Sequence, residues 1–243
     1  MSRVTYGFNK RNTKIVAHRG ASGIERENTC PAFIAAGNRT YYGVETDIHV
    51  GINGEFIVIH DDTTTRVSGG MYNFNVEETP YSILKEIILP DIDGSNVRRD
   101  IRIPLVSDYI SICKNYGKVC VLEIKGDFGY AKLKELINEI KPLDYLDNIT
   151  FISFGYQNCL DLRALLPESK IQFLTGEYSA ELLERLKNDK IDLDIHYSAL
   201  TEEIVKELHD NGIEVNCWTV DDPTDAERLA SWGVDYITSN ILE

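Results

Sequence analysis

The chain has 243 residues, 43% of them hydrophobic, which is enough for one large core or two small ones without disulfides or a structural metal. Its 25 Lys and Arg stand against 39 Asp and Glu, giving a formal net charge of −14. This acidic surplus, with no long basic run, argues against nucleic acid and anionic membranes as partners. An anionic substrate would therefore need a local source of positive charge.

Short apolar runs alternate with segments of helical spacing along the chain. The first two runs, residues 14–18 and 43–48, flank a predicted helix over residues 30–37, with Thr29 as its N-cap and Pro31 in its first turn. The later predicted strands are residues 119–125, 149–154, 170–175, 191–197, 213–219 and 234–238. The predicted helices between them are residues 130–140, 157–166, 180–187, 202–211 and 224–231.

Eight strands alternating with helices predict an α/β fold, a closed (β/α)8 TIM barrel, in which functional residues lie at the carboxyl ends of the strands. A doubly wound open sheet is the alternative, but the glycine-rich nucleotide-binding motifs that favour it are missing from the sequence. Residues 61–104 are rich in turn residues and too long for an ordinary connection, so we predict that this insertion caps the site. The whole chain, 1–243, is predicted to be one barrel domain.

Charged side chains occur where three of the predicted strands end. Residues two apart in a strand point to the same face of the sheet, so each pair within a strand should act together. These residues are His18 and Arg19 after the first strand, Glu45 and Asp47 in the second, and Glu123 and Lys125 in the third. If Leu122 and Ile124 face the helices, the carboxylates face the interior of the barrel.

A hairpin extension is predicted after the second strand. The strand continues to Asn53 and Gly54, a strong two-residue turn signal, and returns over residues 55–60. With a two-residue loop, paired residue numbers sum to 107, which places Asp47 opposite His60 on one face. A shift of one residue would turn His60 away.

Three carboxylates gathered at a barrel mouth repel one another unless a cation lies among them. Oxygen ligands alone favour Mg²⁺ or Ca²⁺, with Mn²⁺ as a further candidate. Two histidines beside that ion can serve as general acid and general base, and Arg19 and Lys125 supply positive charge. Together these residues predict metal-assisted cleavage of a phosphodiester.

At these residues the chain resembles the glycerophosphodiester phosphodiesterase family and, more distantly, the phosphatidylinositol-specific phospholipases C. The motifs include IVAHRGASGIERENT, GVETDIHVGINGEFIVIHDDTTTR, VLEIK and CWTV, and matching stretches run in the family's order along the chain. The resemblance implies a (β/α)8 barrel that hydrolyses glycerophosphodiesters to glycerol 3-phosphate and an alcohol, using a divalent cation.

Carried over to matching positions, the resemblance also implies a role for each site residue. The histidines become the catalytic pair, three acidic residues hold the metal, and two basic residues and a tryptophan bind the substrate. The expected base is His18 and the expected acid His60; the expected metal ligands are Glu45, Asp47 and Glu123; Arg19 and Lys125 hold the phosphate, and Trp218 lines the glycerol side.

Two alternative functions remain open at this stage. One is cleavage of a lipid phosphodiester, which the acidic composition and the lack of a basic amphipathic helix disfavour. The other is a non-catalytic barrel that binds a phosphorylated ligand, which the paired histidines disfavour. Direct attack by water and attack by the substrate's own glycerol hydroxyl are both compatible with the residues. The alcohol released and the oligomeric state are not readable from the sequence.

Several further polar residues are expected to have structural roles. Glu27 and Asn28 are expected to brace the first loop, His209 to lie on the surface, and His49 and His196 to be structural rather than to touch substrate. The five cysteines form no C-x-x-C pair, which argues against zinc or redox chemistry. With no signal peptide and no long apolar segment recognised, we predict a cytoplasmic protein without stable membrane association.

Overall fold

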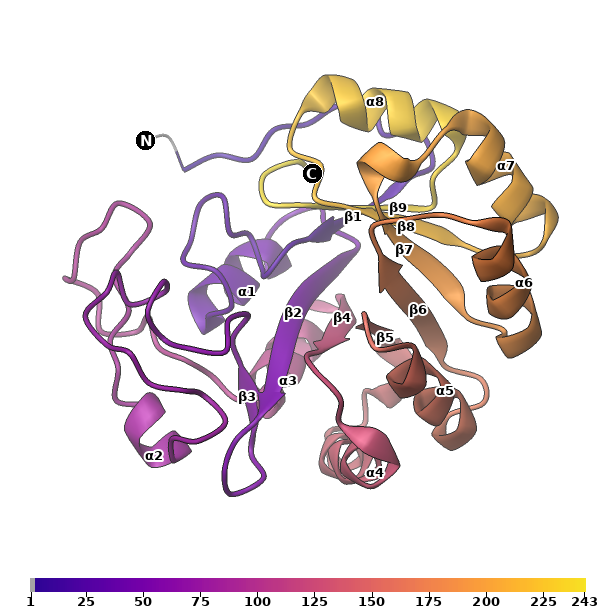
Figure 1. Cartoon of the computed structure of the whole chain (residues 1–243). Helices are drawn as coiled ribbons and strands as arrows, with labels where there is room; N and C mark the ends of the chain where they lie inside the picture. The colour runs from indigo at the N-terminus through magenta and orange to yellow at the C-terminus, as the bar shows by residue number, and fades with distance from the viewer. Residues whose placement is uncertain (1–2) are drawn as a thin grey trace.

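Eight parallel strands close into a barrel with helices around it in the computed structural model, which describes residues 3–243 (Figure 1). The barrel strands are β1 (Lys14–Ala17), β2 (Gly43–Val50), β4 (Val119–Ile124), β5 (Ile149–Ser153), β6 (Lys170–Thr175), β7 (Asp192–His196), β8 (Val215–Trp218) and β9 (Tyr236–Ser239). The ring closes because β1 pairs with both β9 and β2. The predicted (β/α)8 barrel is confirmed.

Helices cover the outer face of the barrel. They are α1 (Cys30–Gly37), α3 (Val106–Tyr116), α4 (Gly129–Ile140), α5 (Tyr156–Leu165), α6 (Ala180–Asp189), α7 (Glu202–Asp210) and α8 (Pro223–Trp232), with short 3₁₀ turns at Lys141–Leu143, Leu146–Asn148 and Tyr197–Ala199. The short helix α2 (Tyr81–Leu84) lies in the insertion after β3 (Phe56–Val58). Helix α1 begins as predicted, because the Thr29 side chain accepts a hydrogen bond from the Ala32 N–H. No helix of the described chain is both long and apolar enough to cross a membrane.

Helix α3 was missed by the sequence prediction. It directly follows the turn-rich insertion, whose irregular composition obscured where the next regular element begins. The helix ends at Gly117, which has a φ of 64° and so adopts the left-handed conformation that favours glycine. Its apolar residues at positions 106, 109, 110 and 113 are buried, with the spacing of one helix face.

Strand alternation separates two cores. Leu122 and Ile124 belong to the large core between strands and helices, whereas Val121 packs with Val16 and Ile152 inside the barrel. Successive residues of a strand point to opposite faces, so residue 123 faces the interior like residue 121. The predicted orientation of this strand is therefore confirmed.

The predicted register of the hairpin is wrong by one residue. Strand β3 (Phe56–Val58) runs antiparallel to β2, but Ile48 lies opposite Val58, so paired residue numbers sum to 106 and not 107. The Ile59 N–H donates to the Asp47 carbonyl at 3.1 Å, so Ile59 occupies the place predicted for the histidine.

A longer turn explains this error. The Gly51 N–H bonds to the Glu55 carbonyl at 2.7 Å, which leaves three residues, 52–54, in the loop. Gly54 has a φ of 94°, a conformation that glycine adopts without strain. His60 nevertheless reaches the site, because it lies beyond the last residue of β3 and is free of the strand's alternation.

The insertion after β3 builds a small hydrophobic cluster of its own. This cluster includes Val67, Val76, Leu84 and Ile101, and it packs on Ile57 of β3. In Figure 1 the insertion and α2 lie beside β3, on the side of the molecule away from α6 and α7. Its role as a cap, and the assignment of the chain to a single domain, stay predictions.

Asp192, the first residue of β7, offers a test of stability that is independent of the site. Burial raises the pKa of its carboxyl to about 6, although the carboxylate accepts the Glu214 N–H at 2.9 Å. The folded state therefore holds a proton that the unfolded state releases near pH 4. The contribution of Asp192 to stability is greatest below that pH and is lost as the pH rises through 6.

Substitution Asp192→Asn is expected to raise the free energy of unfolding at pH 8 by about 1–2 kcal/mol, because it removes a buried charge and keeps an acceptor. At pH 4 the change should be close to zero. Urea unfolding at the two pH values measures both quantities. An equal change at both would contradict the assignment of the effect to ionisation of Asp192.

Candidate active site

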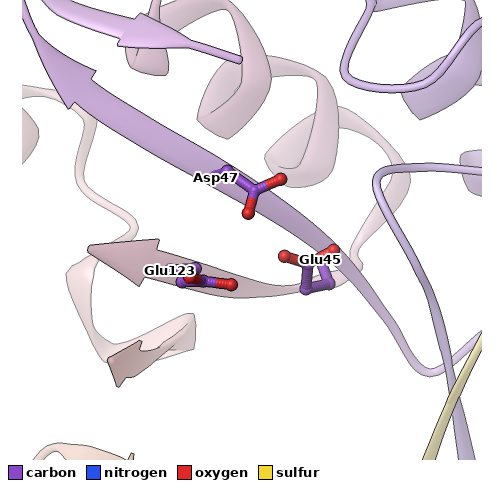
Figure 2. Close-up of side chains that lie close together, drawn as sticks. All are labelled: Glu45, Asp47 and Glu123. Carbon is purple, nitrogen blue, oxygen red and sulfur yellow. The ribbon is translucent and has the colours of Figure 1, made fainter. Parts of the chain in front are cut away.

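Three buried carboxylates meet at the carboxyl ends of two neighbouring strands. Glu45 and Asp47 come from β2 and Glu123 from β4, and Figure 2 shows the three side chains directed toward one another. Asp47 lies opposite Glu123 in the register, and one oxygen of each residue lies within 4.8 Å of the others. The exposed fractions are 3%, 1% and 8% for Glu45, Asp47 and Glu123. The structure thus brings together the three predicted metal ligands.

The electrostatics of this carboxylate cluster favour a bound cation. Burial, followed by the negative charges of Asp47 and Glu123, raises the pKa of Glu45 well above its ordinary value. Burial and Asp47 likewise raise the pKa of Glu123 to about 7. Burial also opposes ionisation of Asp47, but Arg19 and other nearby cations outweigh it and lower the pKa of Asp47.

The donor set fits a hard divalent ion. Within residues 3–243, Asp47 Oδ1 is buried without a hydrogen-bond partner, and Lys125 Nζ lies 3.7 Å from it. Carboxylate oxygens are the ligands that Mg²⁺ and Ca²⁺ prefer. Glu45, Asp47 and Glu123 are therefore the residues that could hold such an ion.

The loop after β1 holds these carboxylates in place. The Arg19 backbone N–H donates to Glu45 Oε2 at 2.7 Å, and Arg19 Nε lies 3.5 Å from Asp47 Oδ2. Asn28 donates to the same Asp47 oxygen at 2.7 Å and accepts from the Thr46 hydroxyl at 2.7 Å. Asn28 thus orients a carboxylate of the cluster directly, which goes beyond the predicted bracing of the loop.

His18 is held by a chain of polar groups at the end of the barrel. Its Nδ1 lies 2.7 Å from Asn240 Oδ1, and Asn240 in turn donates to Asp221 at 2.7 Å. Because Nδ1 faces an acceptor oxygen, it carries the proton and leaves Nε2 as the free acceptor. Burial, reinforced by the charge of Arg19, lowers the pKa of His18. The arrangement favours a neutral imidazole.

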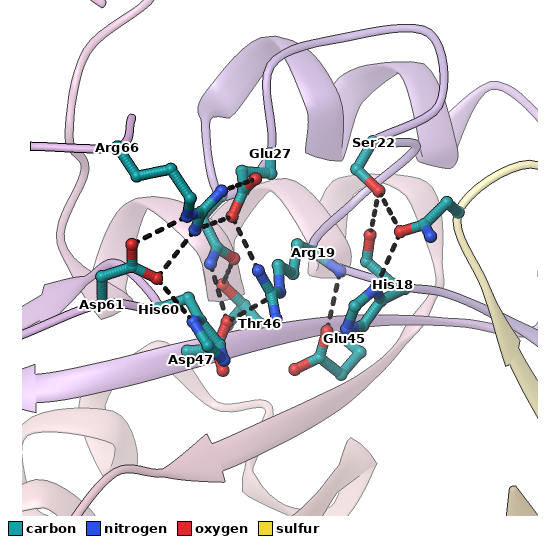
Figure 3. Close-up of polar contacts among 12 residues, drawn as sticks. His18, Arg19, Ser22, Glu27, Glu45, Thr46, Asp47, His60, Asp61 and Arg66 are labelled. Atoms are coloured by element: carbon teal, nitrogen blue, oxygen red, sulfur yellow. Dashed lines mark hydrogen bonds and ion pairs between the residues drawn. The ribbon is translucent and has the colours of Figure 1, made fainter. Parts of the chain in front are cut away.

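His60 is held by a second chain, which Figure 3 shows reaching from the insertion to the first loop. His60 Nδ1 lies 2.7 Å from Asp61 Oδ1, and Arg66 donates to both oxygens of Asp61 at 2.7 and 2.8 Å. Arg66 also donates to both oxygens of Glu27, at 2.6 and 2.8 Å. Glu27 is also bonded to Arg19 at 2.8 Å, so the chain links the two histidine loops.

The charges of this second chain stabilise one another. Arg66 is the main cause that lowers the pKa of Asp61, with a further contribution from His60. Burial acts against Glu27, yet Arg66 and Arg19 hold the pKa of Glu27 to about 2. Burial lowers the pKa of His60, and the negative charge of nearby Asp47 opposes that shift.

Two adjoining cavities open at the carboxyl ends of the strands. The inner cavity, of about 160 Å³, is lined by His18, Arg19, Glu45, His60, Glu123 and Trp218 together with residues of the barrel interior. The outer cavity, of about 410 Å³, shares Glu123 and Phe154 with it and contains Lys125, whose Nζ lies 2.9 Å from Glu123 Oε1. Of the predicted site residues, all but Asp47 line one or both of these adjoining spaces.

Trp218 lies between two aromatic rings. Its ring centroid is 5.6 Å from that of Phe154 and 5.2 Å from that of His196, with both neighbours edge-on. His49 is buried away from the cavities, with Nδ1 3.1 Å from Glu77 Oε1, and His209 pairs with Asp235. These positions agree with structural roles for His49 and His209.

Sequence reasoning did not identify Asp61, Arg66 or Asn240 as members of the site, nor the contact of Asn28 with the carboxylates. Asp61 could have been suggested as a site residue from the sequence, because it directly follows the predicted site residue His60. Asn28 and Asn240 reach the site from loops that are remote in sequence from their partners, and Arg66, five residues after Asp61, also bonds to Glu27, 39 residues before it. Strand alternation carries no information about such loops.

Comparisons with known proteins agree with this geometry. The profile of the Glycerophosphoryl diester phosphodiesterase family matches residues 18–242. A glycerophosphodiester phosphodiesterase of Caldanaerobacter subterraneus subsp. tengcongensis is 29% identical over 237 residues, which are 94% of this chain and 94% of that protein.

Solved structures share the fold over nearly the whole chain. An Oleispira antarctica phosphodiesterase, described in complex with the product sn-glycerol-3-phosphate, has a TM-score of 0.86 at 24% identity and covers 97% of this chain and 96% of its own. A glycerophosphodiester phosphodiesterase from Parabacteroides distasonis has a TM-score of 0.78 at 27% identity, with 94% and 93% covered. The chain belongs to the glycerophosphoryl diester phosphodiesterase family.

Proposed function

We propose that this protein hydrolyses small glycerophosphodiesters to glycerol 3-phosphate and an alcohol, with a divalent cation and two histidines. The observation that carries the proposal is the inner cavity, where His18 and His60 face the same space as Glu45 and Glu123. Membership of the family and the name of the Caldanaerobacter relative support the substrate class.

Glu45, Asp47 and Glu123 would hold the cation, which we expect to be Mg²⁺ or Ca²⁺, with Mn²⁺ as a further candidate. When bound, it supplies positive charge that stabilises the phosphate oxygens as negative charge builds up in the transition state. Arg19 lines the inner cavity and Lys125 the outer one, so their side chains can bind the phosphate from two sides.

The two histidines would divide the proton transfers between them. The neutral form of His18, with Nδ1–H bonded to Asn240, leaves Nε2 ready to accept the proton of the attacking hydroxyl. The Asp61 carboxylate at His60 Nδ1 orients the ring and partly offsets the burial that lowers the pKa of His60, and in the protonated ring Nε2–H would donate to the leaving alkoxide. The attacking hydroxyl comes from water or from the glycerol arm itself; a trapped cyclic phosphate would identify the second route.

The small volume of the inner cavity favours a small substrate over a lipid. An inner cavity of about 160 Å³ has room for a phosphate and a short polyol, but an acyl chain would have to leave it. This observation, with a formal net charge of −14, argues against phospholipid surfaces as the substrate.

The test is turnover by the purified protein with Mg²⁺, Ca²⁺ or Mn²⁺. Glycerophosphocholine and glycerophosphoethanolamine should release glycerol 3-phosphate in equal amount to the free alcohol, whereas phosphatidylinositol vesicles or lysophosphatidylcholine micelles should give at least about tenfold lower kcat/KM. Tight binding of glycerol 3-phosphate with no turnover under any of the three metals would instead favour a non-catalytic binding barrel.

A further inference from the structure

Asp221 lies at the far end of the polar chain that holds His18. It follows strand β8, whereas Asn240 follows β9 and His18 follows β1. These three strands are neighbours in the barrel, so their carboxyl ends bring the three residues together. The lining of the two cavities includes His18 but neither Asp221 nor Asn240. Any effect of Asp221 on the reaction must therefore pass through Asn240.

The carboxylate of Asp221 accepts hydrogen bonds at both oxygens. Its Oδ1 accepts the Asn240 backbone N–H at 2.8 Å and the Ser239 hydroxyl at 2.9 Å. The Ser239 hydroxyl is itself the acceptor for the N–H groups of Ile241 and Leu242, at 3.2 and 3.0 Å, so its own proton points to Asp221. The second oxygen, Oδ2, accepts from the Asn240 side chain at 2.7 Å. Each of these neighbours of the carboxylate is thus a donor.

This carboxylate fixes which way the side-chain amide of Asn240 points. An ionised carboxylate can only accept, so the NH₂ group of Asn240 must face Asp221 and its oxygen must face His18. The opposite orientation would bring two oxygen atoms together at 2.7 Å without a proton between them. Ser22, drawn beside His18 in Figure 3, does not decide the orientation, because its hydroxyl lies 2.7 Å from Asn240 Oδ1 and can either donate or accept.

The direction of the Asn240 amide in turn fixes the ring proton of His18. An acceptor oxygen 2.7 Å from Nδ1 requires the proton on Nδ1, and a neutral imidazole has only one ring proton. Nε2 is then the free acceptor that a general base needs. An amide NH₂ group in the same place would require the reverse, with the proton on Nε2 and no base available to the cavity.

We propose that Asp221 is a positioning residue that sets the tautomer of His18 through the orientation of the Asn240 amide. The consequence for catalysis rests on the proposed function, because it assumes that His18 is the base. The pKa of His18 is lowered mainly by burial and by the charge of Arg19. The contribution that we assign to Asp221 is the direction of two hydrogen bonds and not a shift of that pKa.

Substitution Asp221→Asn is expected to reverse the tautomer. The new amide must keep its oxygen at the place of Oδ1, where two donors meet it. Its NH₂ group then faces the NH₂ group of Asn240, so the Asn240 amide turns over and donates to His18 Nδ1. With glycerophosphocholine as substrate, kcat should fall by about tenfold or more, because most molecules then lack a free Nε2.

A second substitution should restore the original direction. In the double variant Asp221→Asn/Asn240→Asp, the carboxylate at position 240 accepts from the new amide and from His18 Nδ1–H, so the tautomer of the wild type returns. The kcat of the double variant should come within about threefold of the wild-type value. Such a recovery is not expected if Asp221 only stabilises its loop, because the double variant carries two changes there.

Asp222→Asn is the matched control. It removes the same charge from the next residue and keeps an acceptor at the N-cap of α8. The tautomer of His18 should stay that of the wild type, and kcat should change by less than about twofold.

Histidine ring ¹⁵N–¹H spectra measure the tautomer without turnover, because the nitrogen that carries the proton and the free nitrogen differ strongly in chemical shift. Protein labelled with ¹⁵N at histidine is studied with and without Mg²⁺ at about pH 9, where a neutral imidazole is expected. His18→Gln identifies the signals of His18. The wild type, the double variant and Asp222→Asn should show Nδ1–H, whereas Asp221→Asn should show Nε2–H.

Each outcome decides for or against the inference. If the wild type carries the proton on Nε2, or if Asp221→Asn keeps it on Nδ1, the inference is wrong. A double variant that shows the same tautomer and the same loss of kcat as Asp221→Asn would also contradict it. A reversed tautomer with unchanged kcat would support the positioning role and refute the assignment of His18 as the base. If the wild type shows no turnover with any of the three metals, the proposed function fails, while the spectra still decide the inference.

Discussion

Replacing His60 by alanine is expected to lower kcat on glycerophosphocholine by about 10²- to 10⁴-fold, because the leaving alkoxide then departs without a proton donor. The effect should depend on the leaving group. With a glycerophospho-p-nitrophenol substrate, whose phenolate leaves without protonation, His60→Ala should lose less than about tenfold. His18→Ala should lose about 10²-fold or more on both substrates, since both need the attacking hydroxyl to be deprotonated. Steady-state rates of the two variants on the two substrates measure this difference.

His209→Gln is the matched control, because it changes a histidine that pairs with Asp235 on the outside of the barrel. Its rates should equal those of the wild type on both substrates. Full activity of His60→Ala on glycerophosphocholine would refute the acid role. Equal losses for the two histidine variants on the p-nitrophenyl substrate would show that the base and acid are not divided between His18 and His60 as proposed.

Local strand geometry is the part of the site that could be predicted from the sequence. Glu45, Asp47 and Glu123 were predicted to meet because residues two apart in a strand share a face, and the structure brings these three carboxylates together. The barrel itself followed from the regular alternation of strands and helices. Such predictions depend only on the short-range periodicity within strands and helices, which is independent of the length and conformation of the loops.

Loop geometry limited the rest of the prediction. The placement of His60 opposite Asp47 failed because the hairpin loop holds three residues, with Gly54 at a φ of 94°, where a two-residue turn was expected. The correct proximity of His60 to the site then arises from a different cause, the contacts of Asp61 and Arg66 with the first loop. The bonds between Arg66 and Glu27 join residues 39 apart in sequence, and no periodicity predicts them.

A second limit concerns Asp194 Oδ1 and Trp218 Nε1, which belong to residues that line the inner cavity. Alternation places both residues inside the barrel, but only the three-dimensional neighbours reveal that their polar atoms lack partners among residues 3–243. Most polar side chains of the interior, such as Asn216 and Gln172, do find partners. Trp218 was already expected to line the glycerol side, whereas for Asp194 the signal is the buried carboxylate oxygen without a hydrogen-bond partner in the described chain.

Substitution Glu45→Gln is expected to abolish the stabilisation of the protein by a divalent cation and to reduce kcat/KM by about 10²-fold or more. In the metal-free protein the same change should raise the thermal midpoint, because the charged neighbours of Glu45 include two buried carboxylates and the amide still accepts the Arg19 N–H. For the wild type, the free energy of unfolding should rise by about 2–3 kcal/mol when the ion is present at 100 times its dissociation constant. A substitution that raises the thermal midpoint without the ion, and removes the stabilisation when the ion is present, would be difficult to explain by a purely structural role of Glu45.

Thermal unfolding with a chelator and then with Mg²⁺, Ca²⁺ or Mn²⁺ measures both shifts without any reliance on turnover. Glu184→Gln removes one negative charge from the exposed face of α6 and should leave the cation-dependent shift intact. A shift as large in Glu45→Gln as in the wild type would show that the ion binds elsewhere. Asp47 Oδ1 is buried without a hydrogen-bond donor in the described chain, and Lys125 Nζ lies 3.7 Å from it, so the protein alone compensates the charge of this oxygen poorly. The cation should therefore serve folding and chemistry through the same three oxygens.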